Sequence, residues 1–264
     1  MDTPSIASHA PGGRPADAME AKLYGFKGAA PSLSGELMLR HKGVPYRRVN
    51  LIWFRAHRSL PRKGFPGRTA PALLLDGRPV QTNRAIARAL DEAVPEPQLF
   101  PADPVERWHV EGAESFADEV LQHATRRMFL WSSTRDPDSV TPHPAIGRMP
   151  IPRNSWLRAL AMRRPFEHYG ITDAVVREDF DALPEMLDKL DAFVADGVLN
   201  GPEPNAADLQ IAPLIGALMG IGDLGAEIGR RPVAGLATRL LPAGRSRRGA
   251  GIRAAPGAMV KPSG

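Results

Sequence analysis

The fold is decided by residues 68–90, RTAPALLLDGRPVQTNRAIARAL. Within this stretch an apolar run is followed by Asp76-Gly77, a pair typical of the two-residue turn in a β-hairpin, and by a second short strand. Apolar residues then recur at helical spacing over 83–92. Pro71 is unusual because a proline at the start of a strand cannot donate a ladder hydrogen bond. The stretch predicts a hairpin followed by a helix.

The residues before this hairpin predict a strand, a helix and a second strand. The apolar run 21–26, AKLYGF, is a short strand, and residues 32–42 form a helix that ends before Gly43. Residues 46–51 alternate as a strand. Two parallel strands joined through a helix require a right-handed crossover. We therefore expect an α/β thioredoxin-like domain over residues 21–93, with a proline-containing linker over 94–103.

The pattern after residue 104 is helical and predicts an all-α C-terminal domain over 104–242. One long helix covers 104–131, and a proline-rich break over 132–152 reads either as a lid over a cleft or as disorder. A further helix covers 173–197. Asn205, with Asp208 three residues on, has the spacing of a capping box and opens the next helix.

Composition limits the chemistry that the chain can perform. The 264 residues include no cysteine, which excludes disulfides, zinc ribbons and cysteine nucleophiles. No apolar run approaches the roughly 20 residues that span a bilayer. The net charge of +5 is concentrated in a basic tail over 243–264, which, like the leader over 1–20, is predicted to be disordered. We expect a cytoplasmic protein with no membrane partner, and nucleic acid is not an expected partner either.

Three pieces of the sequence together resemble glutathione transferases, over about residues 22–241. The first is Thr69-Ala70-Pro71, similar to the position where that family places a cis-proline. The second is VQTNRAIARAL (80–90), similar to the family's strand-to-helix junction, and the third is LNGPEPNAADLQIAP (199–213), similar to its buried capping motif. The resemblance implies the glutathione transferase architecture, and the capping motif is expected to be structural.

The resemblance also implies a binding frame for a thiol peptide. The backbone N–H and C=O of Ala70, before a cis Pro71, would pair with the cysteinyl unit of glutathione, and Arg68 would meet its glycyl carboxylate. The helix N-terminus at Asn83 would hold the γ-glutamyl carboxylate. Thr82 stands where the family has an acidic residue that pairs with the ligand's ammonium, so another low-molecular-weight thiol or a different small ligand is also open.

The residue that activates the thiol in relatives has no equivalent in this chain. Pro31, Ala29 and Gly25 fall at the positions of the family's cysteine, serine and tyrosine, and none of them is competent. Ser32 and Ser34 remain nearby. Each either caps the helix or donates a hydrogen bond to a thiolate, and Ser32 is the first choice for that catalytic role.

Other candidates have both a binding and a structural interpretation. Arg126 and Arg127, near Trp131, either hold an anionic second substrate or form ion pairs with Asp118 or Glu119. Glu119 and His123 offer only two ligands at helical spacing, too few to predict a metal. The basic residues before the hairpin either touch the ligand or are solvated, and they are Arg55, His57, Arg58, Arg62, Lys63 and Arg68.

Two functions therefore remain open from the sequence. The chain is either a transferase that conjugates glutathione or a related thiol to small electrophiles, with no cofactor beyond that thiol, or a non-catalytic module that binds a ligand or a protein. The resemblance also implies a homodimer.

Overall fold

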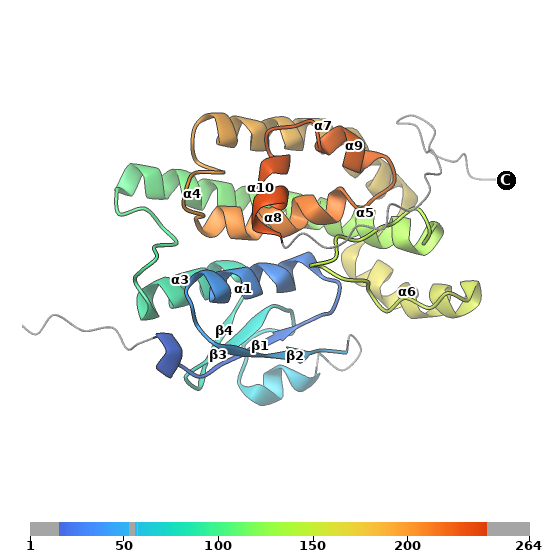
Figure 1. Cartoon of the computed structure of the whole chain (residues 1–264). Coiled ribbons are helices and arrows are strands. Elements are labelled where there is room, and N and C mark those ends of the chain that lie inside the picture. The colour runs from blue at the N-terminus through green and yellow to red at the C-terminus, as the bar shows by residue number, and fades with distance from the viewer. Residues whose placement is uncertain (1–15, 53–55, 57, 242–264) are drawn as a thin grey trace, which may run out of the picture.

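The computed structural model describes residues 16–52, 56 and 58–241. The predicted tail, and residues 1–15 of the predicted leader, lie outside these residues. A four-stranded mixed sheet, in the order β2-β1-β3-β4, forms one layer (Figure 1). Its strands are β1 (Ala21–Gly25), β2 (Tyr46–Asn50), β3 (Ala72–Leu75) and β4 (Arg78–Gln81). The sequence prediction of a thioredoxin-like domain is confirmed.

The hairpin forms as the sequence indicates. β3 and β4 pair antiparallel with Leu75 opposite Arg78, and the turn residues Asp76 and Gly77 both have positive φ, 47° and 82°. Two positive φ values are the mark of a type I′ turn, which explains the Asp-Gly pair. β3 also pairs antiparallel with β1, while β1 and β2 run parallel and are connected through a helix.

Two helices cover one face of the sheet. They are α1 (Ala30–His41) and α3 (Asn83–Ala93), and both lie between the sheet and the helical region in Figure 1. The alternation of β1 sends Leu23 into this main core. Tyr24 points to the opposite face, where it packs edge-on against Phe65 at a centroid distance of 5.5 Å. The side chain of Tyr24 is therefore directed away from α1.

The second half of the chain forms a helical region, which lies above α1 and α3 in Figure 1. Its helices are α4 (Pro104–Phe116), α5 (Gln122–Arg135), α6 (Ser155–Tyr169), α7 (Asp173–Ala195), α8 (Ala206–Leu218), α9 (Leu224–Ile228) and α10 (Ala234–Leu240). The long helix predicted over 104–131 extends to Arg135. A π-helical turn at Ala117–Leu121 joins α4 to α5 without interrupting the helix.

Helix α8 is enclosed on every side: all 13 of its residues are buried. Its N-terminus has the predicted capping box, in which Asn205 accepts from the Asp208 N–H at 3.0 Å and Asp208 accepts from the Asn205 N–H at 3.1 Å. Asp208 accepts a further bond from the N–H of Asn200. The motif provides hydrogen-bond partners for backbone N–H groups at the buried start of α8, where water cannot reach them. Its role is therefore structural, as expected.

The proline-rich segment after α5 crosses the base of α8. Val140 forms an isolated bridge with Ile221, and Thr141 donates to the Gly220 carbonyl at 2.7 Å. Ile146 is buried near Gly216 of α8. The segment is irregular, as predicted, but it is packed against the domain. It ends in α6, a helix that the sequence interpretation missed although Asn154 caps its first turn.

A buried lysine fixes the linker to the first domain. Lys42 follows α1, and its Nζ lies 2.6 Å from Asp91 Oδ1 and donates to the backbone carbonyls of Val94, Pro95 and Pro97. Asp91 in turn accepts from the N–H of Leu99. The chain that leaves α3 is thus held by one ammonium group whose bonds are all made inside the protein.

Glu114 generates a pH-dependent prediction. Its carboxylate is fully buried, and burial raises its pKa to about 7, although Arg88 Nη2 lies 3.0 Å away and opposes the shift. A raised folded-state pKa stabilises the protein at low pH, and this contribution is lost as pH rises through about 7. We expect Glu114→Gln to increase the free energy of unfolding at pH 8 by roughly 2 kcal/mol and to leave it nearly unchanged at pH 5.

Urea unfolding at the two pH values measures this effect. The matched control is Glu111→Gln, because Glu111 lies on the same helix and also within 3.3 Å of Arg88 but is partly exposed. The control is expected to show no such gain at high pH. A wild-type stability that stays level between the two pH values would contradict the assignment.

Candidate functional site

The hairpin and the start of α3 bring four of the predicted site residues together. The Thr82 N–H donates to the Pro71 carbonyl at 3.3 Å, so Ala70-Pro71 and Thr82-Asn83 lie side by side. The bond between Ala70 and Pro71 is cis. Neither backbone group of Ala70 forms a hydrogen bond with any residue that the structure describes. A peptide-like guest therefore finds one donor and one acceptor available there.

The junction before α3 has an unusual backbone. Thr82 has φ 78° and ψ 152°, a conformation that β-branched residues rarely adopt, and such outliers gather at binding sites. Its hydroxyl accepts from the Ala85 N–H, so Thr82 is the helix cap and Asn83 is the first helical residue. Asn83 is only 3% exposed, and its Oδ1 has no hydrogen-bond partner among the described residues.

Gln81, which the sequence interpretation overlooked, shapes the loop that leads to Ala70. Its Oε1 accepts from the Gly67 N–H at 2.7 Å, and its Nε2 donates to the Thr69 carbonyl. A Cβ at position 67 would lie 2.8 Å from Gln81 Oε1, so a larger residue there would displace the Gln81 side chain. The sequence signal that could have identified Gln81 is its position as a polar residue at the end of an apolar strand, directly before Thr82. Arg68 lies exposed on this loop.

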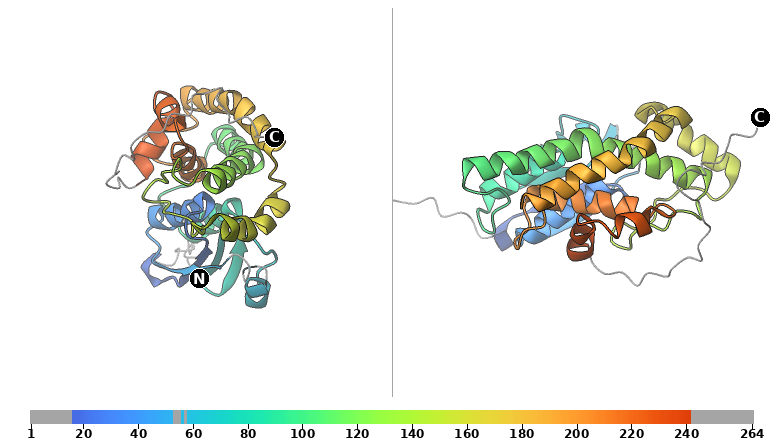
Figure 2. Two further views of the ribbon diagram at one scale, coloured as in Figure 1. Left: turned by 90° about the vertical axis from the view of Figure 1, so that its right-hand side faces the viewer. Right: turned by 90° about the horizontal axis from the view of Figure 1, so that it is seen from above.

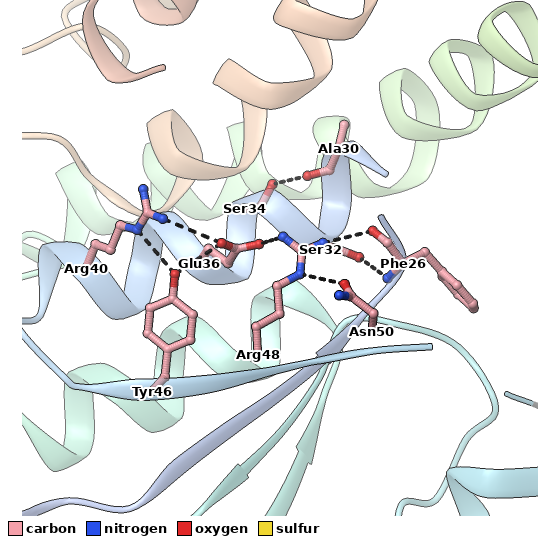
Figure 3. A network of polar contacts seen from close by, with 9 residues as sticks. All are labelled: Phe26, Ala30, Ser32, Ser34, Glu36, Arg40, Tyr46, Arg48 and Asn50. Carbon is pink, nitrogen blue, oxygen red and sulfur yellow. Dashed lines mark hydrogen bonds and ion pairs between the residues drawn. The ribbon is translucent and has the colours of Figure 1, made fainter. Parts of the chain in front are cut away.

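A polar network fixes the loop between β1 and α1. The Phe26 N–H donates to Ser32 Oγ at 3.0 Å, and the Phe26 carbonyl accepts from Arg48 at 3.1 Å (Figure 3). Arg48 also pairs with the buried carboxylate of Glu36, and Tyr46 donates to the same carboxylate at 3.1 Å. Burial, reinforced by Glu36, raises the pKa of the Tyr46 phenol. The network ties α1 to β2 beneath the predicted site.

The two candidate serines have different surroundings. Ser32 is buried beside Gly25, and its hydroxyl accepts the Phe26 N–H, while no described residue accepts its proton. Ser34 faces the other way in Figure 3, toward α8, and its hydroxyl lies 3.3 Å from the carbonyls of Ala30 and Gln210. The structure thus brings Ser32 to the β1–α1 loop and places Ser34 in the contact between α1 and α8.

The segment after α5 reaches the same loop. A Cβ on Gly28, which has φ 79°, would lie 2.6 Å from the Met149 backbone nitrogen. Only a glycine permits this approach. Residues near Met149 therefore wall the region in front of α1, where the sequence interpretation placed either a lid or disorder.

The predicted second-substrate residues join α5 to α7. Arg127 forms a bidentate pair with Asp179, with N–O distances of 2.7 and 2.6 Å, instead of pairing with Asp118 or Glu119. Trp131 donates from Nε1 to Asp173 at 2.8 Å. Both groups are engaged within the helical region, and in the described part of the chain they form no hydrogen bond or ion pair with Ala70, Pro71, Thr82 or Asn83. The partners lie 42 or more residues away in the sequence, so a local sequence pattern could not predict these pairs.

The basic residues before the hairpin are spread over an exposed loop. Arg58, Arg62 and Lys63 are exposed, and Lys63 lies 5.6 Å from the centre of the Tyr24 ring. Arg55 and His57 lie outside the described residues. Within residues 16–52, 56 and 58–241, no group of three or more acidic or histidine side chains could hold a metal ion.

Comparisons with known proteins agree with this geometry. Residues 23–98 match the family model described as the glutathione S-transferase N-terminal domain. No curated protein matches the chain in sequence. The chain is similar in structure to a glutathione S-transferase of Ceriporiopsis subvermispora in complex with glutathione, with TM-score 0.62, 15% identity and coverage of 83% of this chain and 94% of that one.

Two other solved structures are similar over most of their length. The β-etherase LigF from Sphingobium sp. strain SYK-6 has TM-score 0.56 and 19% identity, with coverage of 83% of this chain and 98% of that one. A glutathione S-transferase from Methylobacterium radiotolerans, in complex with glutathione sulfonate, has TM-score 0.54 and 16% identity, with coverage of 85% and 96%. Residues 23–98 are therefore similar to the glutathione S-transferase N-terminal domain, and the chain as a whole has the glutathione S-transferase fold.

Proposed function

We propose that the chain binds a carboxylate-bearing thiol, glutathione or a close relative, and transfers it to small electrophiles. Two observations on the described residues carry this proposal: the backbone donor and acceptor of Ala70 are unused, and Asn83 beside them is buried with no hydrogen-bond partner for its Oδ1. The ligand's cysteinyl unit lies along Ala70 as an added strand. Its carboxylate meets the N-terminus of α3, where peptide N–H groups and the helix dipole attract an anion.

The site favours the carboxylate of the ligand over its ammonium. The first turn of α3 contains no acidic residue, and Thr82 offers a neutral hydroxyl that already accepts a backbone N–H. A carboxylate at that position would add a charge-assisted bond to an ammonium, which is stronger than a neutral one. Without it, the ammonium contributes little to binding.

We assign Ser32 to stabilise the thiolate by donating a hydrogen bond to it. Its oxygen is held by the Phe26 N–H, which leaves the hydroxyl proton free to donate to an anionic sulfur at the start of α1. The helix N-terminus lowers the pKa of a thiol in the same place. The thiolate then attacks the electrophilic carbon, and the leaving group departs with its electron pair.

A non-catalytic binding protein is the second candidate. The observation that favours it is the enclosure of Ser32, which is 1% exposed and engaged with Phe26. Under this alternative the thiol still binds, but no hydroxyl reaches its sulfur. Binding and turnover therefore have to be measured separately.

Calorimetric titration with two ligands tests the binding site. We expect glutathione and its analogue that lacks the ammonium, glutaryl-cysteinyl-glycine, to bind within about threefold of each other, because no acid pairs with the ammonium. A site with that acid would lose roughly tenfold or more with the analogue. Asn83→Ala is expected to weaken both ligands about tenfold. Absence of binding by either ligand to the folded protein would refute the proposal.

Turnover separates the enzyme from the binding protein. Ser32→Ala should lower the conjugation rate of a small aryl halide by about a hundredfold, as for other lost donors to a developing anion. Ser34→Ala is the matched control, since it removes a buried hydroxyl of the same helix that faces α8. It should alter stability alone. Binding without any turnover in the wild type would establish the second candidate.

Gln81 generates a prediction for a positioning residue. Gln81→Leu removes both bonds that hold residues 67–69, so we expect about a tenfold loss of thiol affinity and faster tryptic cleavage at Arg68. Titration below the unfolding temperature and timed proteolysis measure the two effects. Unchanged cleavage would show that Gln81 does not organise the loop.

We also infer that two copies associate through α4. Val105 and Trp108, 64% and 70% exposed, stand on one face of this helix, and Gly112 continues that face one turn later with open space around it. Large exposed apolar side chains next to a small residue suit a close helix–helix contact.

Light scattering tests the association. Trp108→Glu is expected to halve the mass of the wild-type particle, because a buried charge cannot be accommodated in an apolar contact. Trp156→Glu, an exposed tryptophan on α6, is the control and should leave the mass unchanged. A monomeric wild type would contradict this inference.

A further inference from the structure

Helix α6 presents apolar side chains to solvent. Trp156 and Leu160, 63% and 61% exposed, lie one turn apart on the same side, and Leu157 beside them is also exposed. The opposite side carries Met162 and Pro165, which are buried and attach the helix to the domain. Such a cluster on a projecting element exceeds the single exposed residues that soluble surfaces normally carry.

Arginines surround this apolar cluster. The segment 148–168 contains no lysine and a single acid, Glu167, which pairs with Arg163 at 3.7 Å. Its basic residues are Arg148, Arg153, Arg158, Arg163, Arg164 and His168. Arg163 and Arg164 follow Leu160 by one turn and flank the line of apolar side chains. The face combines an apolar strip with a basic rim.

The helix lies at one end of the molecule. It lies below α5 in Figure 1 and reaches beyond it, and it lies at the same end in the view from above in Figure 2. A hollow of about 550 Å3 separates one flank of α6 from the ends of α5 and α7. The exposed side chains of Trp156 and Leu160 lie on the side of α6 opposite the buried Met162 and Pro165, so a flat partner can reach them.

The apolar side chains and the arginines of α6 together indicate which kind of partner binds this helix. A second copy of the helix, or the basic stretch 243–264 of the same chain, carries the same sign and would be repelled. Nucleic acid matches the arginines but gives no apolar medium for Trp156 and Leu160. An acidic protein would have to expose an apolar surface of its own beside its acidic residues to receive Trp156 and Leu160. An anionic bilayer supplies both the apolar layer and the negative charge.

We propose that α6 binds the surface of an anionic phospholipid bilayer. The helix lies along the bilayer plane, Trp156, Leu157 and Leu160 enter the boundary between headgroups and acyl chains, and Arg163 and Arg164 remain at the phosphates. None of the described helices is long and apolar enough to cross a membrane, so the contact is peripheral. The sequence interpretation expected no membrane partner because no apolar run is long enough to span a bilayer, and a peripheral contact needs no such run.

Flotation with vesicles tests the proposal on the full chain. We expect binding to phosphatidylcholine vesicles that contain about one third phosphatidylglycerol, and little binding to phosphatidylcholine alone. Trp156→Ser/Leu160→Ser should weaken binding at least about tenfold, and Arg163→Glu/Arg164→Glu roughly tenfold to a hundredfold. Arg47→Glu/Arg78→Glu is the control, with the same net-charge change placed on strands β2 and β4, and it should change binding less than about threefold.

Fluorescence locates the helix on the vesicle. Brominated lipid should quench the tryptophan emission of the wild type, and Trp156→Phe should remove most of that quenching. The proposal fails if the wild type does not float with anionic vesicles, which would leave an acidic protein as the partner. It also fails if the control loses as much binding as the Arg163/Arg164 variant, or if quenching persists without Trp156.

Discussion

Helix α8 has no side that faces solvent, and this enclosure shapes both halves of the protein. A helix buried on all sides cannot leave its terminal N–H groups to water, so the Asn205–Asp208 box must satisfy them. The same burial brings α1 against α8, where the Ser34 hydroxyl reaches the Gln210 carbonyl. Because α1 also carries Ser32, the position of the β1–α1 loop depends on how α8 sits in the core.

The elements that could be predicted from the sequence are those whose signals are local. Asp76-Gly77 determines a turn with two positive φ values, and the Asn205 box marks a helix start, because each depends on residues within four positions. Helix α6 was missed because its outward side is as apolar as its buried side, so no helical periodicity separates the two. The π-helical turn at 117–121 likewise leaves no periodic trace.

The candidate site also contains residues that local motifs predict and residues that depend on tertiary contacts. Ala70, Pro71, Thr82 and Asn83 could be brought together from motifs, because the hairpin register and one turn place them side by side. The role of Gln81 and the approach of Met149 to Gly28 depend on tertiary contacts between distant segments. Arg127 illustrates the limit: its partner Asp179 lies on another helix, and no spacing rule relates them.

The segment from the end of α5 to the start of α7 connects the two surfaces for which we propose ligands. They are the region beside the β1–α1 loop and the exposed side of α6. The first half of this segment passes the C-terminal end of α8 and brings Met149 against Gly28 of the β1–α1 loop. Its second half is α6, which leaves the body with its apolar side outward. The bridge at Val140 and the burial of Ile146 hold the first half to α8, the most enclosed helix of the protein. The contacts with α8 therefore position both the residues that lie against the β1–α1 loop and the start of α6.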